Sequence, residues 1–216
     1  MSSQTSASEN RPRRSDGERT HGAILEAAMR LASIEGLGGL TIGRLAAELG
    51  VSKSGVYAHF RSKERLQRET ISAARTVFET EVIAPGLQAP EGLPQLEGLC
   101  KAFLSYVERG VFPGGCFFGQ ILAELDAQRG PLHGEVAETQ RGWLALLQEL
   151  GDAACERGEL APDTDTRQLA FELTAVLELA NYLSTLYEDA EYIAAGRAGV
   201  TNLIARARGK SGWKFK

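Results

Sequence analysis

The twenty residues from Thr41 to Phe60 constrain the fold more than any other stretch of this chain. Apolar residues recur at i, i+3, i+4 and i+7 in the first half, a pattern that predicts one short amphipathic helix. Thr41 is a favourable N-cap for that helix, and Gly50 follows it where a left-handed C-cap is expected. Ser52 can cap a second short helix that turns Val56 and Phe60 inward. The stretch therefore predicts two short helices joined by a tight turn.

The second of these helices is expected to expose side chains that are small, polar or cationic: Lys53, Ser54, Gly55, Tyr57, Ala58 and His59. A face with little bulk can enter the major groove of DNA, whose floor offers hydrogen-bond donors and acceptors. A glycine within a helix costs about 1 kcal/mol relative to alanine, which is understandable where the backbone must approach DNA closely. This is the helix-turn-helix arrangement. A plain helical hairpin with a solvated outer face has the same spacing, so spacing alone leaves both interpretations open.

The run from Gly50 to Leu66, G-V-S-K-S-G-V-Y-A-H-F-R-S-K-E-R-L, closely resembles the DNA-binding signature of the tetracycline-repressor (TetR) family of bacterial regulators. The resemblance implies that Tyr57 and His59 face phosphates and that Lys63 contacts a phosphate from the start of the following helix. It also implies a palindromic double-stranded DNA operator as partner. The residues expected at the DNA are Thr41, Ser52, Lys53, Ser54, Gly55, Tyr57, His59 and Lys63. For His59 the alternative is a capping histidine, and for Lys63 an ordinary exposed lysine.

Charge and composition agree with one DNA-binding end. Residues 1–75 carry 12 Lys or Arg against 8 Asp or Glu, whereas residues 76–216 carry 12 against 20. A positive end on an acidic body suits a protein that touches phosphates with one end only. The chain has 216 residues, with no apolar run long enough for a membrane span and no hydrophobic signal core. Three cysteines without metal spacing are typical of the reducing cytoplasm, which is the expected location.

Helical periodicity continues to the end of the chain and predicts an all-α protein of about nine helices. The domain boundaries we expect are a disordered arm over 1–16, a three-helix helix-turn-helix head over 17–62, a helical ligand-binding and dimerisation domain over 63–208, and a flexible tail over 209–216. Outside the head, helices are expected over 62–84, 96–109, 116–128, 132–157, 165–187 and 189–207, with prolines and glycines ending most of them.

The helix over 165–187 is apolar around most of its girth, because Leu177, Leu179 and Leu186 widen its main stripe. A helix of this kind is buried on more than one side, which in a chain of this size suggests packing against a second subunit. The family's two-fold dimer, built from its last two helices, implies the same homodimer. The residues expected at the dimer interface form the main stripe: Leu169, Leu173, Val176, Ala180, Leu183 and Tyr187.

Aromatic and aliphatic side chains of the body are candidates for a cavity that binds a small hydrophobic or aromatic effector. They are Phe103, Tyr106, Cys116, Phe118, Leu122, Trp143 and Leu147. The alternative for each is a place in the core. Cys116 follows two glycines at a helix start, where a thiolate is favoured, so an electrophile sensor is a second hypothesis beside a buried structural cysteine. The acidic residues of the body are expected on solvated helix faces.

No catalytic pattern is evident. The three histidines, His21, His59 and His133, lie far apart in the sequence, and we expect neither catalytic residues nor metal ligands nor a cofactor. The function expected is a dimeric regulator, a repressor released from its operator by a ligand. The alternative is a helical small-molecule-binding or electrophile-sensing protein without operator binding.

Overall fold

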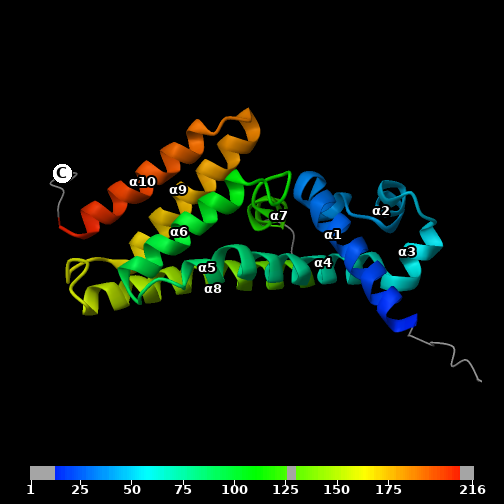
Figure 1. Ribbon diagram of the computed structural model, residues 1–216, viewed down its shortest axis with the longest axis horizontal. Helices are drawn as coiled ribbons and strands as arrows, with labels where there is room; N and C mark the ends of the chain where they lie inside the picture. Colours follow the sequence, from blue (N-terminus) through cyan, green and yellow to red (C-terminus); the bar gives the residue numbers. More distant parts are fainter. Residues whose placement is uncertain (1–12, 126–129, 210–216) are drawn as a thin grey trace, which may run out of the picture.

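The computed structural model describes residues 13–125 and 130–209, with side chains from residue 17 onward, and within these ranges it is entirely helical. Figure 1 shows an elongated molecule with a small head at one end and a helical body at the other. Counting the rod α4–η1–α5 as one, the described residues form nine helices, as expected. The elements are α1 (Arg13–Gly39), α2 (Ile42–Leu49), α3 (Lys53–Phe60), α4 (Lys63–Phe78), the π-helical turn η1 (Glu79–Ile83), α5 (Ala84–Gly86), α6 (Leu93–Glu108), α7 (Phe117–Leu125), α8 (Pro131–Glu156), α9 (Thr166–Tyr187) and α10 (Glu191–Ala207).

The head is formed by α1, α2, α3 and the start of α4. The expected caps are present: the Thr41 hydroxyl accepts the amide of Arg44 at 3.1 Å, and Gly50 ends α2 with a φ of 64°. The two short helices pack on α1 and α4 through side chains that are fully or almost fully buried, namely Leu37, Leu40, Leu45, Val56, Phe60 and Leu66. The core thus fixes the angle at which α3 stands on the head.

A single rod, α4–η1–α5, leads from the head into the body (Figure 1). Its end differs slightly from the expected stop at Ala84, because the rod continues to Gly86. One turn before Pro85 the helix widens, and the amide of Ala84 bonds to the carbonyl of Glu79, five residues earlier. A proline in a regular helix clashes with the carbonyl four residues before it, and a π turn relieves that clash.

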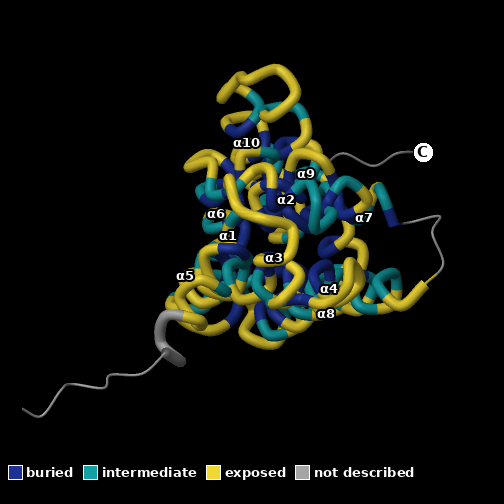
Figure 2. Tube along the Cα trace, turned by 90° about the vertical axis from the view of Figure 1, so that its right-hand side faces the viewer, coloured by how far each residue is buried: buried dark blue, intermediate teal, exposed yellow. Residues whose placement is uncertain are grey.

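In the body, α6 lies in the middle and packs on α8, α9, α10 and the η1–α5 end of the rod, while α9 packs most extensively on α10 and α8. Figure 2, viewed along the molecule from the side turned to the right in Figure 1, shows buried backbone inside and exposed turns outside. The helices α6 and α8 begin earlier than expected, at Leu93 and Pro131. Each has a proline in its first turn, where the missing backbone N–H leaves no hydrogen bond unmade.

Several expectations fall at the edges of the described ranges. The helix α1 begins at Arg13, within the expected arm, and its regular part ends at Gly36, where φ is 72°. Residues 1–12, 126–129 and 210–216 lie outside the description, so most of the expected arm and tail is not addressed. None of the helices that the structure describes is both long and apolar enough to cross a membrane.

Candidate functional site

The outer face of α3 is exposed as the spacing predicts. Lys53, Ser54 and Gly55 are exposed, and Tyr57 keeps 55% of its surface open to solvent. The Ser52 hydroxyl caps the helix by accepting the amide of Gly55 at 3.1 Å. A face of small and polar groups therefore stands on a helix whose first turn is already closed by its own cap.

No acidic residue occurs between Glu48 and Glu64, whereas Lys53, Arg61 and Lys63 all lie in this interval. All three cations are exposed. The Lys53 stem lies over Gly43 of α2, because a Cβ added at Gly43 would stand 3.2 Å from the Lys53 Cε. The exposed segment 49–63, which includes α3, thus carries positive charge and no carboxylate of its own, which is the electrostatic footprint of a site for phosphates.

Beside the capping residues Thr41 and Ser52, His59 and Lys63 also have partners within the head. His59 is half-buried, and its ring lies 5.6 Å from that of His21 and 6.3 Å from that of Phe60. The Lys63 ammonium donates to the carbonyl of Gly38 at 2.8 Å, although the side chain remains exposed. Lys63 therefore anchors the head as well as adding positive charge to its surface.

A carboxylate from the body holds the end of α1, an interaction that the sequence analysis missed. The two oxygens of Glu124, near the end of α7, accept the amides of Leu37 and Gly38, each at 2.6 Å. Glycine is needed for this approach, since a Cβ at Gly36 or Gly38 would stand 2.5 or 2.8 Å from a Glu124 oxygen. No local signal in residues 36–39 identifies a partner so far along the chain.

The same loop is held from α4. The Gln67 amide donates to the carbonyl of Leu37 at 2.6 Å, next to the Lys63 contact on Gly38. The residues 37–38 therefore give their amides to α7 and their carbonyls to α4. Any change in the position of α7 relative to α4 must alter at least one of these contacts.

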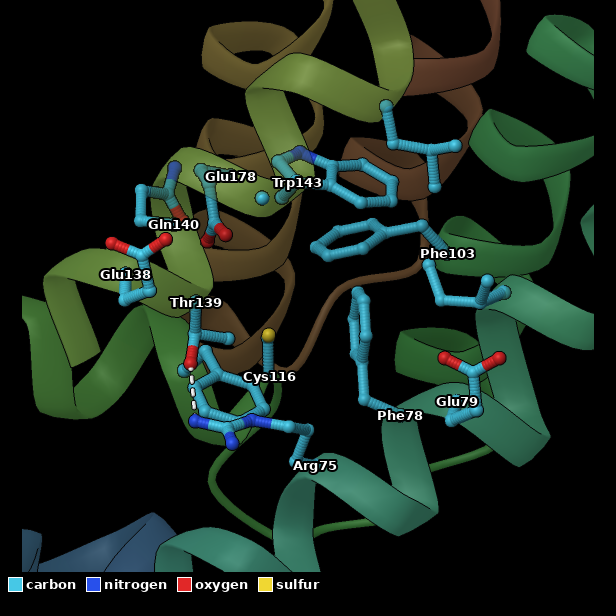
Figure 3. Close-up of a pocket in the computed structure, with 14 residues that line it drawn as sticks. Arg75, Phe78, Glu79, Phe103, Cys116, Glu138, Thr139, Gln140, Trp143 and Glu178 are labelled. Carbon is cyan, nitrogen blue, oxygen red and sulfur yellow. Dashed lines mark hydrogen bonds between the residues drawn. The ribbon is translucent and has the colours of Figure 1, made fainter. Parts of the chain in front are cut away.

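A cavity of about 430 Å³ lies in the body between the rod, α6, α7, α8 and α9. Four of the seven expected residues line it, namely Phe103, Cys116, Phe118 and Trp143. Tyr106 and Leu147 are instead buried in the core, and Leu122 is half-buried away from the lining. The lining residues that the sequence analysis missed include Arg75, Phe78 and Glu178 (Figure 3).

The aromatic wall of the cavity is organised around Phe78, at the end of α4. Its ring centroid lies 5.6 Å from that of Trp143 and 5.9 Å from that of Phe118, with interplanar angles of 78° and 83°. The Phe103 ring completes the group at 6.3 Å from Phe78 and 6.1 Å from Trp143. Edge-to-face packing of this kind fixes ring orientations as well as burying area.

Glu178 corrects the expectation that the body's acidic residues lie on solvated faces. Its carboxylate lines the cavity, where burial raises its pKa to about 7 by disfavouring the charged form. A hydrogen bond from the Asn181 amide, at 3.4 Å, opposes this shift only in part. The side chain points inward because apolar residues occupy most of the girth of α9.

Cys116 lines the cavity beside this carboxylate and is buried. Burial, and then the charge of Glu178, raise the pKa of its thiol far above the usual range. Its backbone amide donates to the Asn181 side chain at 2.7 Å, which fixes the start of α7 on α9. A thiol kept protonated in this way is a poor nucleophile, so the environment favours the structural interpretation of Cys116 over electrophile sensing.

The expected interface stripe on α9 faces mainly inward. Leu169, Leu173 and Ala180 are buried by the chain itself, and Val176 and Leu183 are half-buried. Only Tyr187 of the six is well exposed, at 59%. The exposed apolar residues of α9 lie outside this stripe and are Phe171, Leu179, Tyr182 and Leu186. The helix is therefore apolar on two sides, one packed within the chain and one open.

Two known protein families match most of this chain. The family described as "Bacterial regulatory proteins, tetR family" matches residues 24–70, which hold α2 and α3. The family described as "Tetracyclin repressor-like, C-terminal domain" matches residues 92–200, which hold most of the body. A comparison with curated protein sequences found no match.

Solved structures have the same fold. A TetR transcriptional regulator from Chloroflexus aurantiacus is 26% identical, with a TM-score of 0.81 over 89% of this chain and 97% of that one. A TetR-family regulator from Cytophaga hutchinsonii is 21% identical, with a TM-score of 0.74 over 91% and 98% of the two chains. AibR, solved with isovaleryl coenzyme A and operator DNA, is 20% identical, with a TM-score of 0.66 over 86% and 96%.

Proposed function

Because the chain belongs to the TetR family of transcriptional regulators, we propose that it binds a palindromic operator as a homodimer and represses transcription until a small hydrophobic or aromatic ligand releases it. The observation that carries this proposal is the exposed, carboxylate-free face of α3 on a capped helix-turn-helix. Lys53, Ser54 and Gly55 would meet base edges, and Tyr57 would meet a phosphate. Operator DNA as partner also implies a cytoplasmic location.

A dimer is required by the size of the reading helix. The helix α3 has eight residues, and one such helix reads only a few base pairs. Two heads presented to successive turns of the duplex, about 34 Å apart or somewhat more, read two half-sites. The open apolar side of α9, together with α10, supports a two-fold interface at this place in the body.

The contacts of residues 37–38 suggest how a ligand in the cavity would reach the DNA. Cys116, just before α7, and Phe118 in its first turn line the cavity, and the end of α7 supplies Glu124 to the head. The rod supplies Phe78 to the cavity and Gln67 to the head. A ligand that moves α7 away from the rod would therefore tilt the head and change the spacing of the two α3 helices. Release requires the ligand to bind the two arrangements with different affinity.

The family is one of regulators rather than enzymes, and the rival hypothesis is a helical ligand-binding protein whose hairpin no longer touches DNA. Selection of duplexes from a random library with the full-length protein separates the two. We expect enrichment of an inverted repeat whose half-site centres lie about one helical turn or more apart. Failure to enrich any common sequence would sink the proposal.

Single substitutions on the enriched duplex then test the reading face. Replacing Lys53 with Ala removes one contact from each protomer and should weaken binding by at least about tenfold. It should also relax the sequence preference at the base pair that Lys53 contacts. The matched control is Lys101→Ala, since Lys101 is also an exposed lysine but lies on α6 of the body. Equal effects of the two substitutions would place the DNA elsewhere on the protein.

A further inference from the structure

The cavity in the body is chemically two-sided. Figure 3 shows the rings of Phe78, Phe103 and Trp143 gathered on one side, with the Glu178 carboxylate and the Cys116 thiol on the other. An apolar wall alone would accept any hydrophobic molecule of the right size. A half-buried carboxylate is costly, and its position across from the rings restricts which molecules fit.

The charge of Glu178 has no counter-ion within the described part of the protein. Its one hydrogen bond in the structure comes from the neutral Asn181 amide, and none of the causes that shift its pKa is a cationic side chain. Tyr182, the neighbouring phenol on α9, gives its hydroxyl to the carbonyl of Gly119 at 3.1 Å. The hydrogen bond from Asn181 therefore stabilises the charged carboxylate only in part.

The backbone makes room for this carboxylate. A Cβ added at Gly119, in the first turn of α7, would stand 2.6 Å from the Oε2 of Glu178. Any larger residue at this place would force the Glu178 side chain aside. The glycine therefore allows an acidic group of the cavity lining to lie against α7.

The aromatic rings of the cavity also favour a positively charged ligand. A cation is attracted to the face of an aromatic ring within about 6 Å of its centroid, most strongly for tryptophan and most strongly when water is excluded. The rings of Trp143 and Phe118 stand nearly at right angles to that of Phe78, at 78° and 83°. A molecule in the cavity therefore meets ring faces as well as ring edges.

The remaining charged groups of the lining do not favour an anion. Arg75 donates to the Thr139 hydroxyl at 2.8 Å and is exposed. Glu79 and Glu138 line the cavity as well and are exposed, so carboxylates outnumber cations in the lining. A carboxylate or phosphate in the cavity would have to approach the unneutralised Glu178.

We propose that the effector is a hydrophobic organic cation, an aryl or alkyl ammonium whose positive charge lies between the Glu178 carboxylate and the rings of Phe78, Phe103 and Trp143. This assignment rests on the proposed function, because it takes the cavity to be the effector site. It adds the sign of the charge that the cavity selects. The ring system of the ligand occupies the apolar wall, and its ammonium group provides the counter-ion that the protein lacks.

Equilibrium dialysis of the full-length dimer against three small probes tests the charge selectivity without DNA. The probes are phenyltrimethylammonium, its neutral isostere tert-butylbenzene, and the anion phenylacetate. At pH 8 we expect the cation to bind at least about tenfold more tightly than the isostere, which has the same shape, and the anion to bind least. Tighter binding of the isostere or of phenylacetate, or no measurable binding of the cation, would overturn the proposal.

Glu178→Gln keeps the size of the side chain and removes its charge. It should bring the affinities of cation and isostere to within about threefold of each other while leaving the isostere unchanged. The matched control is Glu138→Gln, since Glu138 also lines the cavity but is exposed and paired with Arg141 at 2.7 Å. A second variant, Phe78→Leu, should weaken cation binding more than isostere binding. An unchanged cation preference in Glu178→Gln would contradict the role of the carboxylate.

The effector role is read out separately. Adding phenyltrimethylammonium to the complex with an enriched duplex should dissociate it in the wild type and not in Glu178→Gln. Selective binding of the cation without dissociation would uphold the charge selectivity and contradict ligand-induced release. Failure to enrich a duplex at all would contradict the proposed function while the dialysis result still stands.

Discussion

At the scale of single residues, the position of Glu178 in the structure departs most from the position expected from the sequence. The sequence surrounds it with Leu177 and Leu179, and a glutamate in a helix of this kind is normally assigned to the solvated side. The two apolar sides of α9 leave little polar girth, and Glu178 faces α7 across Gly119. Helical periodicity predicts which side of a helix carries the main apolar stripe. It does not predict that one charged side chain on that helix points inward. The capping residues Thr41 and Ser52 were predictable, because their partners lie three residues away.

The raised pKa of Glu178 predicts how its replacement changes stability with pH. A group whose folded pKa lies above its unfolded value favours folding fully below the unfolded pKa, and this contribution is lost as pH rises through the folded pKa. For Glu178 the window runs from about 4.5 to about 7. Glu178→Gln does not titrate, so its free energy of unfolding relative to wild type should rise by about 2 kcal/mol between pH 5 and pH 8.

Urea unfolding of both proteins at equal concentration, at pH 5 and pH 8, measures this difference. Other titratable and charged groups face Glu178 or line its cavity, but they are common to both proteins and cancel to first order: Arg75, Glu79, Tyr106, Cys116, Glu138 and Tyr182. A stability difference that is the same at both pH values would show that the carboxylate is solvated and would remove one support for a cation-selective cavity.

At the scale of elements, helix positions were predictable and the contacts between helices were not. Local signals place the helices to within a few residues, because caps, prolines and glycines act over one turn. The hydrogen bonds that Glu124 accepts from residues 37–38 join α7 to α1, and the hydrogen bond from Gln67 joins α4 to the same loop. These interactions depend on the angle at which α7 crosses α1, which only packing determines. The π turn is of the same kind, since Pro85 signals a helix end and not a widened turn.

Replacing Glu124 with Ala tests whether α7 holds the head. One part-buried amide and one exposed amide would lose charged partners at 2.6 Å, so we expect a loss of about 1–3 kcal/mol in the free energy of unfolding. Amide hydrogen exchange of residues 36–40 should accelerate, while exchange within α9 changes little. The matched control is Glu97→Ala, since Glu97 is an exposed acid paired with Arg208 at 3.4 Å and should behave like wild type. Unchanged exchange of residues 36–40 would show that α4 alone positions the head.

At the scale of the whole molecule, α9 has two apolar sides, one packed within the chain and one exposed, and the place of the dimer interface stays a prediction. The stripe from Leu169 through Leu173 to Ala180 is used within the chain, where α9 packs on α8 and α10. The second side carries Phe171, Leu179 and Leu186, with exposed fractions of 61%, 56% and 70%. Burying a row of this kind is favourable by roughly 25 cal/mol for each Å² of apolar surface removed from water. The sequence does not tell the two sides apart, and the packing of neighbouring helices such as α8 and α10 does.

A single charge on the open side of α9 should separate the protomers. We expect Leu179→Glu to sediment as a monomer in analytical ultracentrifugation at concentrations where wild type is a dimer, because two-fold symmetry places the charge in the interface twice. Its helix content should remain, since Leu179 is exposed within the chain. The matched control is Val51→Glu, which alters a similarly exposed aliphatic residue on the head, at 49%, and should stay dimeric.

Because one head reads only half of a palindrome, the monomer should lose most of its affinity for an enriched duplex while each half-site contact remains intact. A monomeric Leu179→Glu that binds the duplex as tightly as wild type would mean that the two heads do not act together, and a dimeric one would move the interface off α9.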